Sequence, residues 1–440
     1  MKRKHSVRNR RARRCLFLIL LALLTLLLIW PRTVHLEGLV SPYAILVDAD
    51  SGEAVAEKEA DVSIYPASMT KVMTALLALE ANPDLEQPVT LPEDIFPELR
   101  AEGASMAGFR PGETATVRDL LYGALLPSGA ECCEALAREV SGSEEAFVEL
   151  MNQKAAELAM RSTHFCNPTG LHDPEHVSTV RDMARLLRAA MQNETFRAIL
   201  SAGRYAVPAT DLHPEGFTMT STFWAELGDV SRRRGQFLGG KTGYTDAAQS
   251  AFVGISQKGD MRVITVVFGS TTEGKWIDTQ HLADYAFAAY SPLPLSEIYT
   301  SSPLSVQVNE AADPNDAQLS LELSDPDGKA ASILCTESEA NEIRSNFSQY
   351  IQTQYPDGGV TAPVQQGSVV GQMIFQYGEM EPVSFDLTAS RTVAAAIPST
   401  EPSATPASSS TSSSGVTVVT HDVSTGGWSP LYLLVIIPVV

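Results

Sequence analysis

Residues 65–80 read YPASMTKVMTALLALE, and this stretch decides the fold. Apolar residues recur at helical spacing from Met69 to Leu79, on a face that is mostly apolar, which predicts a largely buried helix. Ser68 stands at the start of this helix and Lys71 follows three residues later. Because positions i and i+3 share one face, the two side chains lie one turn apart. A hydroxyl beside an amine is the arrangement of a nucleophile and its base.

Lys71 can take the serine proton only when its amine is neutral. Burial and a neighbouring cation both lower the pKa of a lysine, and the apolar helix supplies the burial. Lys241 is the candidate for the neighbouring cation. A helix start at Ser68 also brings backbone N–H groups and the positive end of the helix dipole to the place where negative charge develops on a tetrahedral intermediate.

Two further motifs follow in the chain, Ser128-Gly129-Ala130 and Lys241-Thr242-Gly243. The second precedes a strand pattern, and a glycine at the end of a strand lets a substrate backbone approach closely. The lysine and the threonine beside it offer a cation and a hydroxyl. Those groups suit a terminal carboxylate, which a carboxypeptidase has to hold.

With these three motifs in this order, the chain resembles the low-molecular-mass penicillin-binding proteins, the serine-type D-alanyl-D-alanine carboxypeptidases. The resemblance covers residues 41–397. It rests on the stretch at 65–80 and on the segments GASMAGFRPGETATVRDLLYGALLPSGAE, THFCNPTGLHDPEHVSTVRDMA, GGKTGYT and VQQGSVVGQMIF. It implies an α+β fold: a β-lactamase/transpeptidase-like domain, with an antiparallel sheet flanked by helices, followed by a small all-β domain.

The same resemblance implies the chemistry, the removal of the terminal D-alanine from peptidoglycan stem peptides through an acyl-enzyme. Ser68 would carry the acyl group and Lys71 would be its base. Ser128 would belong to the proton network and help to protonate the leaving amine. The resemblance implies no cofactor and no metal.

Substrate binding is assigned through the resemblance as well. Lys241 and Thr242, with Gly243 beside them, would hold the substrate carboxylate. The backbone N–H groups of Ser68 and Tyr244 would form the oxyanion hole. The expected partner is a peptidoglycan pentapeptide ending in D-Ala-D-Ala, and β-lactams are the expected inhibitors.

The sequence departs from the family pattern at two positions. The second motif usually ends in asparagine, and here Ala130 stands in its place, so an amide that would bind the substrate carbonyl and the lysine is missing. We therefore expect slower turnover, or a water in place of the amide. The position after Ala248 is commonly glycine and here is Gln249.

Local patterns predict further elements of the first domain. A β-hairpin is expected over 43–59, and helices over 117–140, 143–160 and 178–192, the last with Ser178 as its N-cap. Strands are expected over 250–257 and 261–270. The domains expected along the chain are a basic head (1–14), an anchor or signal segment (15–30), the carboxypeptidase domain (41–292), a β-rich domain (295–397), a Ser/Thr/Pro-rich linker (398–427) and an apolar tail (428–440).

The charge is distributed unevenly. Residues 1–14 hold eight Lys/Arg, which leaves 24 basic and 52 acidic residues, a net charge of −28, in the remainder. An acidic body argues against a nucleic-acid partner. Cations before the apolar run at 15–30 favour a membrane anchor with the catalytic domain on the extracytoplasmic side of a bacterial membrane, and hence contact with membrane lipid. A cleaved signal peptide is the alternative, although Pro31-Arg32 is a poor cleavage site.

Three other functions remain open at this point. A β-lactamase needs an efficient deacylating base, and Glu149-Leu150-Met151-Asn152 faintly resembles the motif that supplies it. A zinc peptidase would draw on the HDPEH segment, residues 172–176, although its proline indicates a loop. A wall-binding protein on an inactive peptidase fold is favoured only by Ala130.

Overall fold

The computed structural model describes residues 34–35, 38–82, 84–227, 236–324, 332–378, 380 and 382–396. The predicted basic head, anchor, linker and apolar tail therefore lie outside the described residues. None of the helices within the described ranges combines the length and the hydropathy that a membrane span requires.

A six-stranded sheet forms the centre of the first region, in the order β1-β3-β2-β10-β9-β8. The short pairing of β1 with β3 is parallel, and every other pairing is antiparallel. The strands are β1 (Val34–His35), β2 (Tyr43–Asp48), β3 (Ala54–Lys58), β8 (Phe237–Thr245), β9 (Gln249–Lys258) and β10 (Met261–Ser270). The hairpin predicted over 43–59 and the two predicted strands before and after Gly259 are confirmed.

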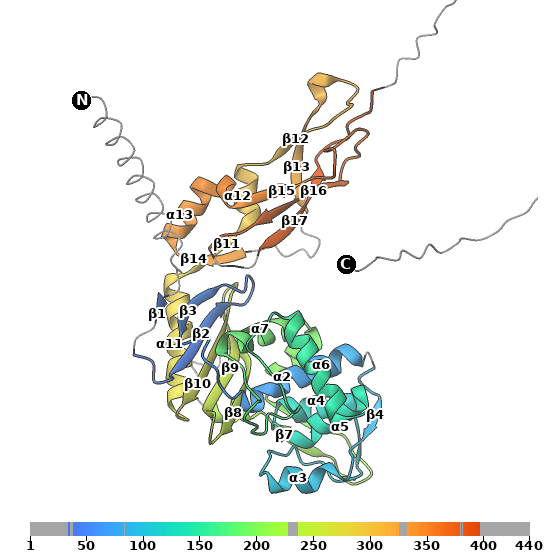
Figure 1. Cartoon of the computed structure of the whole chain (residues 1–440), viewed down its shortest axis with the longest axis vertical. Helices are drawn as coiled ribbons and strands as arrows, with labels where there is room; N and C mark the ends of the chain where they lie inside the picture. The colour runs from blue at the N-terminus through green and yellow to red at the C-terminus, as the bar shows by residue number, and fades with distance from the viewer. Residues whose placement is uncertain are drawn as a thin grey trace, which may run out of the picture. The chain divides into compact units, whose positions relative to one another are not determined.

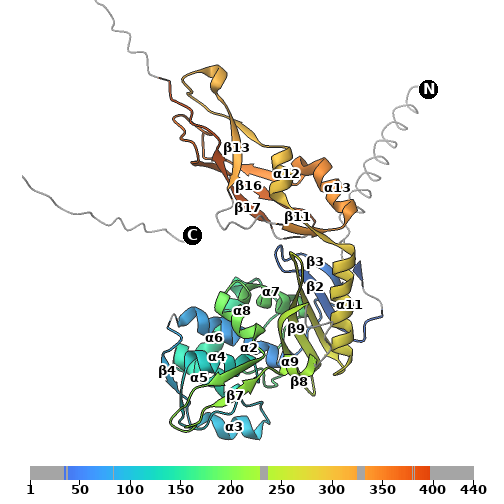
Figure 2. The ribbon, with the colours of Figure 1, turned by 180° about the vertical axis from the view of Figure 1, so that it is seen from behind.

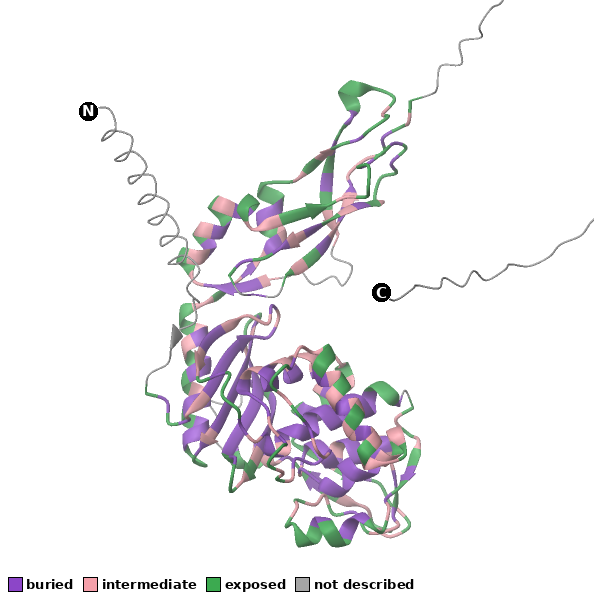
Figure 3. Cartoon of the chain, in the orientation of Figure 1, coloured by how far each residue is buried: buried purple, intermediate pink, exposed green. Residues whose placement is uncertain are grey.

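Helices cover both faces of this sheet (Figures 1 and 2). Alternate residues of β2 point to opposite faces, so Ile45 and Val47 enter one core while Ala44 and Leu46 enter the other. The first core is shared with most of the helices and the second mainly with α11. Figure 3 shows the resulting band of buried residues along the strands.

The helices of this region are α2 (Thr70–Ala81), α3 (Ile95–Ala101), α4 (Val117–Leu125), α5 (Ala130–Ser141), α6 (Glu144–Glu157), α7 (Val180–Ala190), α8 (Glu194–Ser201), α9 (Thr222–Leu227) and α11 (Gly274–Ala289), with a 3-10 turn η1 (Ala67–Met69) before α2. Two small antiparallel sheets of two strands each pair β4 (Pro88–Thr90) with β5 (Thr114–Thr116) and β6 (Arg204–Val207) with β7 (Phe217–Thr220).

Two of the predicted helices differ from those in the structure. The helix predicted over 117–140 is two helices, α4 and α5, which are separated by the turn that contains Ser128. The N-cap of α7 is Thr179 and not Ser178, because the Thr179 hydroxyl accepts the Asp182 N–H. Ser178 is instead an isolated β-bridge partner of Ile64.

The second region is strand-rich, as predicted. Its five-stranded antiparallel sheet has the order β12-β13-β17-β16-β15, and β11 pairs with β14. The strands are β11 (Ser291–Pro294), β12 (Ser305–Gln307), β13 (Gln318–Ser324), β14 (Ser332–Cys335), β15 (Ile351–Gln354), β16 (Val369–Phe375) and β17 (Val383–Ala389). The structure adds helices α12 (Leu295–Ser301) and α13 (Glu337–Asn346) and the 3-10 turns η2 (Pro314–Asp316) and η3 (Phe347–Gln349), which the sequence analysis did not predict.

Candidate active site

The Ser68 hydroxyl lies in η1, directly before α2. Lys71 Nζ donates to Ser68 Oγ at 3.1 Å and to the Thr169 carbonyl at 2.5 Å. The Lys71 side chain is buried, and this burial lowers the pKa of its ammonium. The predicted pair is therefore formed, with the lysine held between the serine and a carbonyl on a distant loop.

The backbone around Ser68 is strained and tightly packed. Ala67 has a positive φ of 49°, which is uncommon for a residue with a Cβ. Its carbonyl oxygen would lie 1.9 Å from a Cβ placed on Gly170, so only glycine fits there. Such strain persists only where the surrounding structure fixes it, and it occurs most often at functional sites. Here the loop at 167–176 provides that support.

This loop holds α2 through three contacts besides that of Gly170. The Thr74 hydroxyl donates to the Pro168 carbonyl, and the Thr169 carbonyl accepts from Lys71. His176 Nε2 lies 2.8 Å from Thr70 Oγ1, while His176 Nδ1 accepts the Cys166 N–H. Since Nδ1 is an acceptor, Nε2 carries the proton and donates to the threonine. Burial lowers the pKa of His176 to about 4, so the ring is neutral at pH 7.

Ser128 lies in the turn between α4 and α5 with a φ of 68°. Lys241 Nζ donates to Ser128 Oγ at 2.9 Å and to the Thr242 carbonyl at 2.8 Å. Burial first, and then the positive charge of Lys71, lower the pKa of Lys241 to about 7. The two lysines thus each contact one serine, and the charge of Lys71 lowers the pKa of Lys241.

The turn at 128–130 packs against a second loop, at residues 105–108. Ala130, which is buried, donates its N–H to the Ser105 carbonyl. Glu131 is also buried, and one of its oxygens accepts the N–H groups of Ala107 and Gly108. A Cβ on Gly129 would lie 2.6 Å from the Ala107 Cβ. These contacts fix the turn that carries Ser128.

Lys241, Thr242 and Gly243 lie within β8, a strand that the sequence analysis did not predict, and they precede β9, the strand that it did predict. Among the described strands, β8 is at the edge of the sheet and pairs only with β9. A Cβ on Gly243 would lie 2.7 Å from Met69 Cε and 3.4 Å from the Ser68 N. Gly243 therefore packs closely on the serine segment, and a Cβ there would have to displace the flexible end of the Met69 side chain.

Tyr244 differs from its neighbours on β8 because its side chain is 60% exposed. Its hydroxyl donates to Asp246 Oδ1 at 3.1 Å. The predicted use of Tyr244 is of its backbone N–H, so an exposed side chain does not conflict with that prediction. Gln249, the second departure from the family pattern, begins β9 with a positive φ of 58° and donates its side-chain amide to the Asp246 carbonyl.

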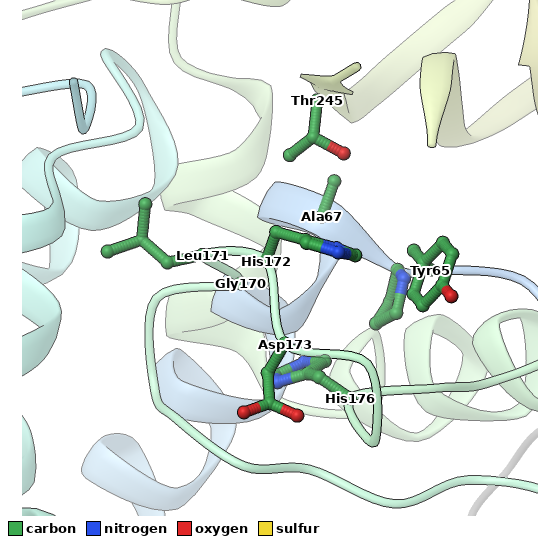
Figure 4. Close-up of a pocket in the computed structure, with 9 residues that line it drawn as sticks. Tyr65, Ala67, Gly170, Leu171, His172, Asp173, His176 and Thr245 are labelled. Carbon is green, nitrogen blue, oxygen red and sulfur yellow. The ribbon is translucent and has the colours of Figure 1, made fainter. Parts of the chain in front are cut away.

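A crevice opens beside the serine segment (Figure 4). Tyr65 packs edge-on against the His172 ring, with the ring centroids 4.8 Å apart, and Thr245 lies above Ala67 in the view of Figure 4. The crevice is lined by Tyr65, Pro66, Ala67, Gly170, Leu171, His172, Asp173, His176 and Thr245.

Two of the open alternatives lose support from this geometry. Across the described ranges, no group of three or more His, Cys, Asp or Glu side chains is placed to bind a metal ion, and both ring nitrogens of His176 are already hydrogen-bonded. Glu149 is exposed on α6. Asn152 of the same motif bonds the backbone of Phe165, which is a structural role.

Residues 32–272 match the family model described as D-alanyl-D-alanine carboxypeptidase. The chain belongs to this family. It is 31% identical over 307 residues to the D-alanyl-D-alanine carboxypeptidase DacF of Bacillus subtilis, covering 64% of this chain and 76% of the relative. It is 29% identical over 354 residues to DacC of Escherichia coli, covering 78% and 82%.

The fold agrees with that of a solved family relative. The crystal structure of the Streptomyces K15 DD-transpeptidase superposes with a TM-score of 0.54 at 28% identity, covering 58% of this chain and all of the relative. The protein is accordingly a serine-type D-alanyl-D-alanine carboxypeptidase, a hydrolase of the penicillin-binding fold, as the sequence analysis predicted.

The sequence analysis missed several residues of the site. Thr169 contributes only its carbonyl, Gly170 only its lack of a side chain, and His176 and Thr222 contact other site residues. The available signals were the proline of the HDPEH segment, which indicates a loop, and the family resemblance of the segment that contains residues 167–176.

Proposed function

We propose that the protein removes the terminal D-alanine of peptidoglycan stem pentapeptides through an acyl-enzyme on Ser68. The observation that carries this proposal is the contact of Lys71 Nζ with Ser68 Oγ at 3.1 Å, made by an amine whose pKa is lowered by burial. A buried lysine within hydrogen-bond reach, whose lowered pKa makes its neutral form easier to reach, is a suitable general base for a serine.

In the first step, neutral Lys71 accepts the Ser68 proton as Oγ attacks the carbonyl carbon of the penultimate D-alanine. The backbone N–H groups of Ser68 and Tyr244 stabilise the oxyanion. The C–N bond then breaks as the leaving nitrogen takes the Ser128 hydroxyl proton, and the proton that Lys71 accepted replaces it, so Lys71 is neutral again; Lys241 contacts the same Ser128 hydroxyl. Water hydrolyses the ester in the second step and regenerates the Ser68 hydroxyl.

Substrate binding would use the open edge of β8. An extended peptide can pair with an edge strand by main-chain hydrogen bonds. Its terminal carboxylate would meet Lys241 and Thr242, a cation and a hydroxyl on the same strand. A β-lactam, which carries a carboxylate near a reactive amide, would acylate Ser68 in the same way.

Mass spectrometry after treatment with penicillin G tests this mechanism. We expect one penicilloyl adduct on wild type, located on Ser68, and none on Ser68→Ala. Ser63→Ala, which changes an exposed serine five residues earlier, is the matched control and should retain the adduct. An unlabelled wild type, or a labelled Ser68→Ala, would refute the acyl-enzyme on Ser68.

Slow turnover is a second proposal, and Ala130 motivates it. This residue is buried where the family pattern has an amide, so no side chain at this position can hold the substrate carbonyl. We expect a burst of one equivalent of D-alanine, released as Ser68 is acylated by a pentapeptide, followed by a slow steady state that is limited by hydrolysis of the acyl-enzyme. A steady-state rate equal to the acylation rate would contradict it.

We also propose that the protein is anchored in a bacterial membrane by residues 15–30, with a carboxypeptidase domain at 41–292 and a β-rich domain at 295–397 outside. The proposal rests on the eight cations that precede the apolar run. Alkaline carbonate should leave the full chain in the membrane pellet. Release into the supernatant, with a new N-terminus after residue 30, would indicate cleavage instead.

A further inference from the structure

Thr222 connects the two sides of the site. It is the first residue of α9, and its N–H donates to the carbonyl of Leu126, two residues before Ser128, at 3.0 Å. Its Oγ1 lies 2.9 Å from Thr242 Oγ1 on β8. The residue therefore joins the turn of Ser128 to the strand that carries Lys241 and Thr242.

The packing around Thr222 fixes this contact. Phe223, the next residue, is buried and stacks on Phe252 of β9 with the ring centroids 5.5 Å apart. On the other side, the Thr242 carbonyl accepts from Lys241, and the Thr242 side chain is itself buried. Neighbouring residues thus hold both threonines in place, so the contact between their hydroxyl groups is fixed by the packing of the site.

The direction of this hydrogen bond decides what Thr242 can do. Each hydroxyl carries one hydrogen, and either threonine can be the donor. If Thr242 donates to Thr222, the single hydroxyl hydrogen of Thr242 is used. A substrate carboxylate would then face a lone pair of Thr242 Oγ1, which cannot donate to it. If Thr222 donates to Thr242, the Thr242 hydrogen is free for a carboxylate oxygen. Only the second arrangement is compatible with carboxylate binding.

We propose that Thr222 is a positioning residue that donates its hydroxyl hydrogen to Thr242 Oγ1, so that the Thr242 hydroxyl donates to the terminal carboxylate of the substrate. This inference rests on the proposed function, because it requires a carboxylate at Thr242. It adds a residue outside the three sequence motifs to the determinants of carboxypeptidase specificity.

A double-mutant cycle tests the proposal. The variants Thr222→Val, Thr242→Val and the double variant are assayed in the full chain for kcat/KM on a D-Ala-D-Ala peptide and for the rate of acylation by penicillin G. We expect Thr222→Val to lose about tenfold, the scale of one hydrogen bond to a charged group. The double variant should be no slower than Thr242→Val alone, because Thr222 acts only through Thr242.

Two further variants separate positioning from packing. Thr222→Ser keeps the hydroxyl and should restore the wild-type rate, while Thr218→Val, at an exposed position on β7, should leave it unchanged. Additive losses in the cycle, or a Thr222→Ser variant as slow as Thr222→Val, would overturn the proposal. Failure of the wild type to be acylated would instead overturn the proposed function, and the role of Thr222 with it.

Discussion

The two folded regions of the chain bury different kinds of side chain. Among the described residues, every buried Lys, Asp, Glu and His lies between Ser41 and Thr279, in the region of the six-stranded sheet. The core of the strand-rich region, from Leu293 to Val393, is built from aliphatic, aromatic and sulfur-containing side chains. Both regions have apolar cores, so the two regions differ in whether they bury ionisable side chains and not only in the size of the core.

Burying a charge costs free energy unless partners compensate for it, so a region that only has to fold avoids doing so. The first region buries Lys71 and Lys241 beside two serines, and both lysine pKa values are lowered as a result. It also buries Glu134 on α5, where burial raises the pKa of the carboxyl to about 8. The contrast teaches that this region gives up stability for reactive groups, while the strand-rich region does not.

The largest expected effect is on the chemistry. Lys71→Met should lower the rate of acylation by penicillin G by about 10³-fold, because the Ser68 proton loses its acceptor. The stability of this variant should equal or exceed that of wild type, since a buried ammonium is replaced by an apolar side chain of similar length. Stopped-flow acylation and chemical denaturation measure the two quantities.

Lys258→Met, at an exposed position at the end of β9, is the control and should change neither quantity. A Lys71→Met variant that is markedly less stable than wild type would break the comparison between the regions.

The opposite outcome is expected in the strand-rich region. Phe375 is buried and stacks on Phe347 with the ring centroids 5.8 Å apart. Phe375→Ala should destabilise this region by about 3–5 kcal/mol, the usual cost of a large cavity, and leave the acylation rate of Ser68 unchanged. Val369→Ala, at a 58% exposed position on the same strand, should cost little by comparison. Chemical denaturation measures the loss of stability, and the acylation assay measures the reactivity of Ser68. A Phe375→Ala variant that is also acylated more slowly than wild type would contradict the prediction.

Glu134→Gln tests the cost of a buried carboxyl. The folded pKa of about 8 lies above the ordinary 4.5, so between these values the unfolded chain releases a proton that the folded chain retains. Stability from this group is therefore lost as the pH rises from about 4.5 to about 8. The variant should be more stable than wild type by about 1–3 kcal/mol at pH 8.

The gain from Glu134→Gln should vanish near pH 4, where the carboxyl is protonated in both states. Thermal unfolding at several pH values measures it. A gain that is independent of pH would show that the carboxyl does not titrate as burial requires.

The smallest effect concerns Lys241, whose charge should be lost as the pH rises through about 7. A guanidinium stays charged, so the kcat/KM of Lys241→Arg relative to wild type should rise about fivefold between pH 7 and pH 8. A ratio that stays constant with pH would mean that Lys241 keeps its charge despite its burial.

Much of the first region could be predicted because its signals are local. Hydrophobic spacing revealed the helix after Ser68, and alternation with a turn revealed the hairpin at 43–59. The break at Ser128 was missed because apolar spacing continues on both sides of the turn. The helices α12 and α13 were missed because both are short. For α13 a local signal was available and was overlooked, because Thr336 and Glu339 form a capping box at its start.

The sequence by itself determined that Ser68 and Lys71 would meet, because three residues in a helix always place two side chains on one face. It also determined the family, through three motifs in a fixed order. Only the tertiary structure decided that Lys241 would contact Ser128, 113 residues away in sequence, that the Thr169 carbonyl would hold Lys71, and that Thr222 would meet Thr242. Contacts between distant segments depend on how sheet, helices and loops pack, and no local spacing encodes that packing.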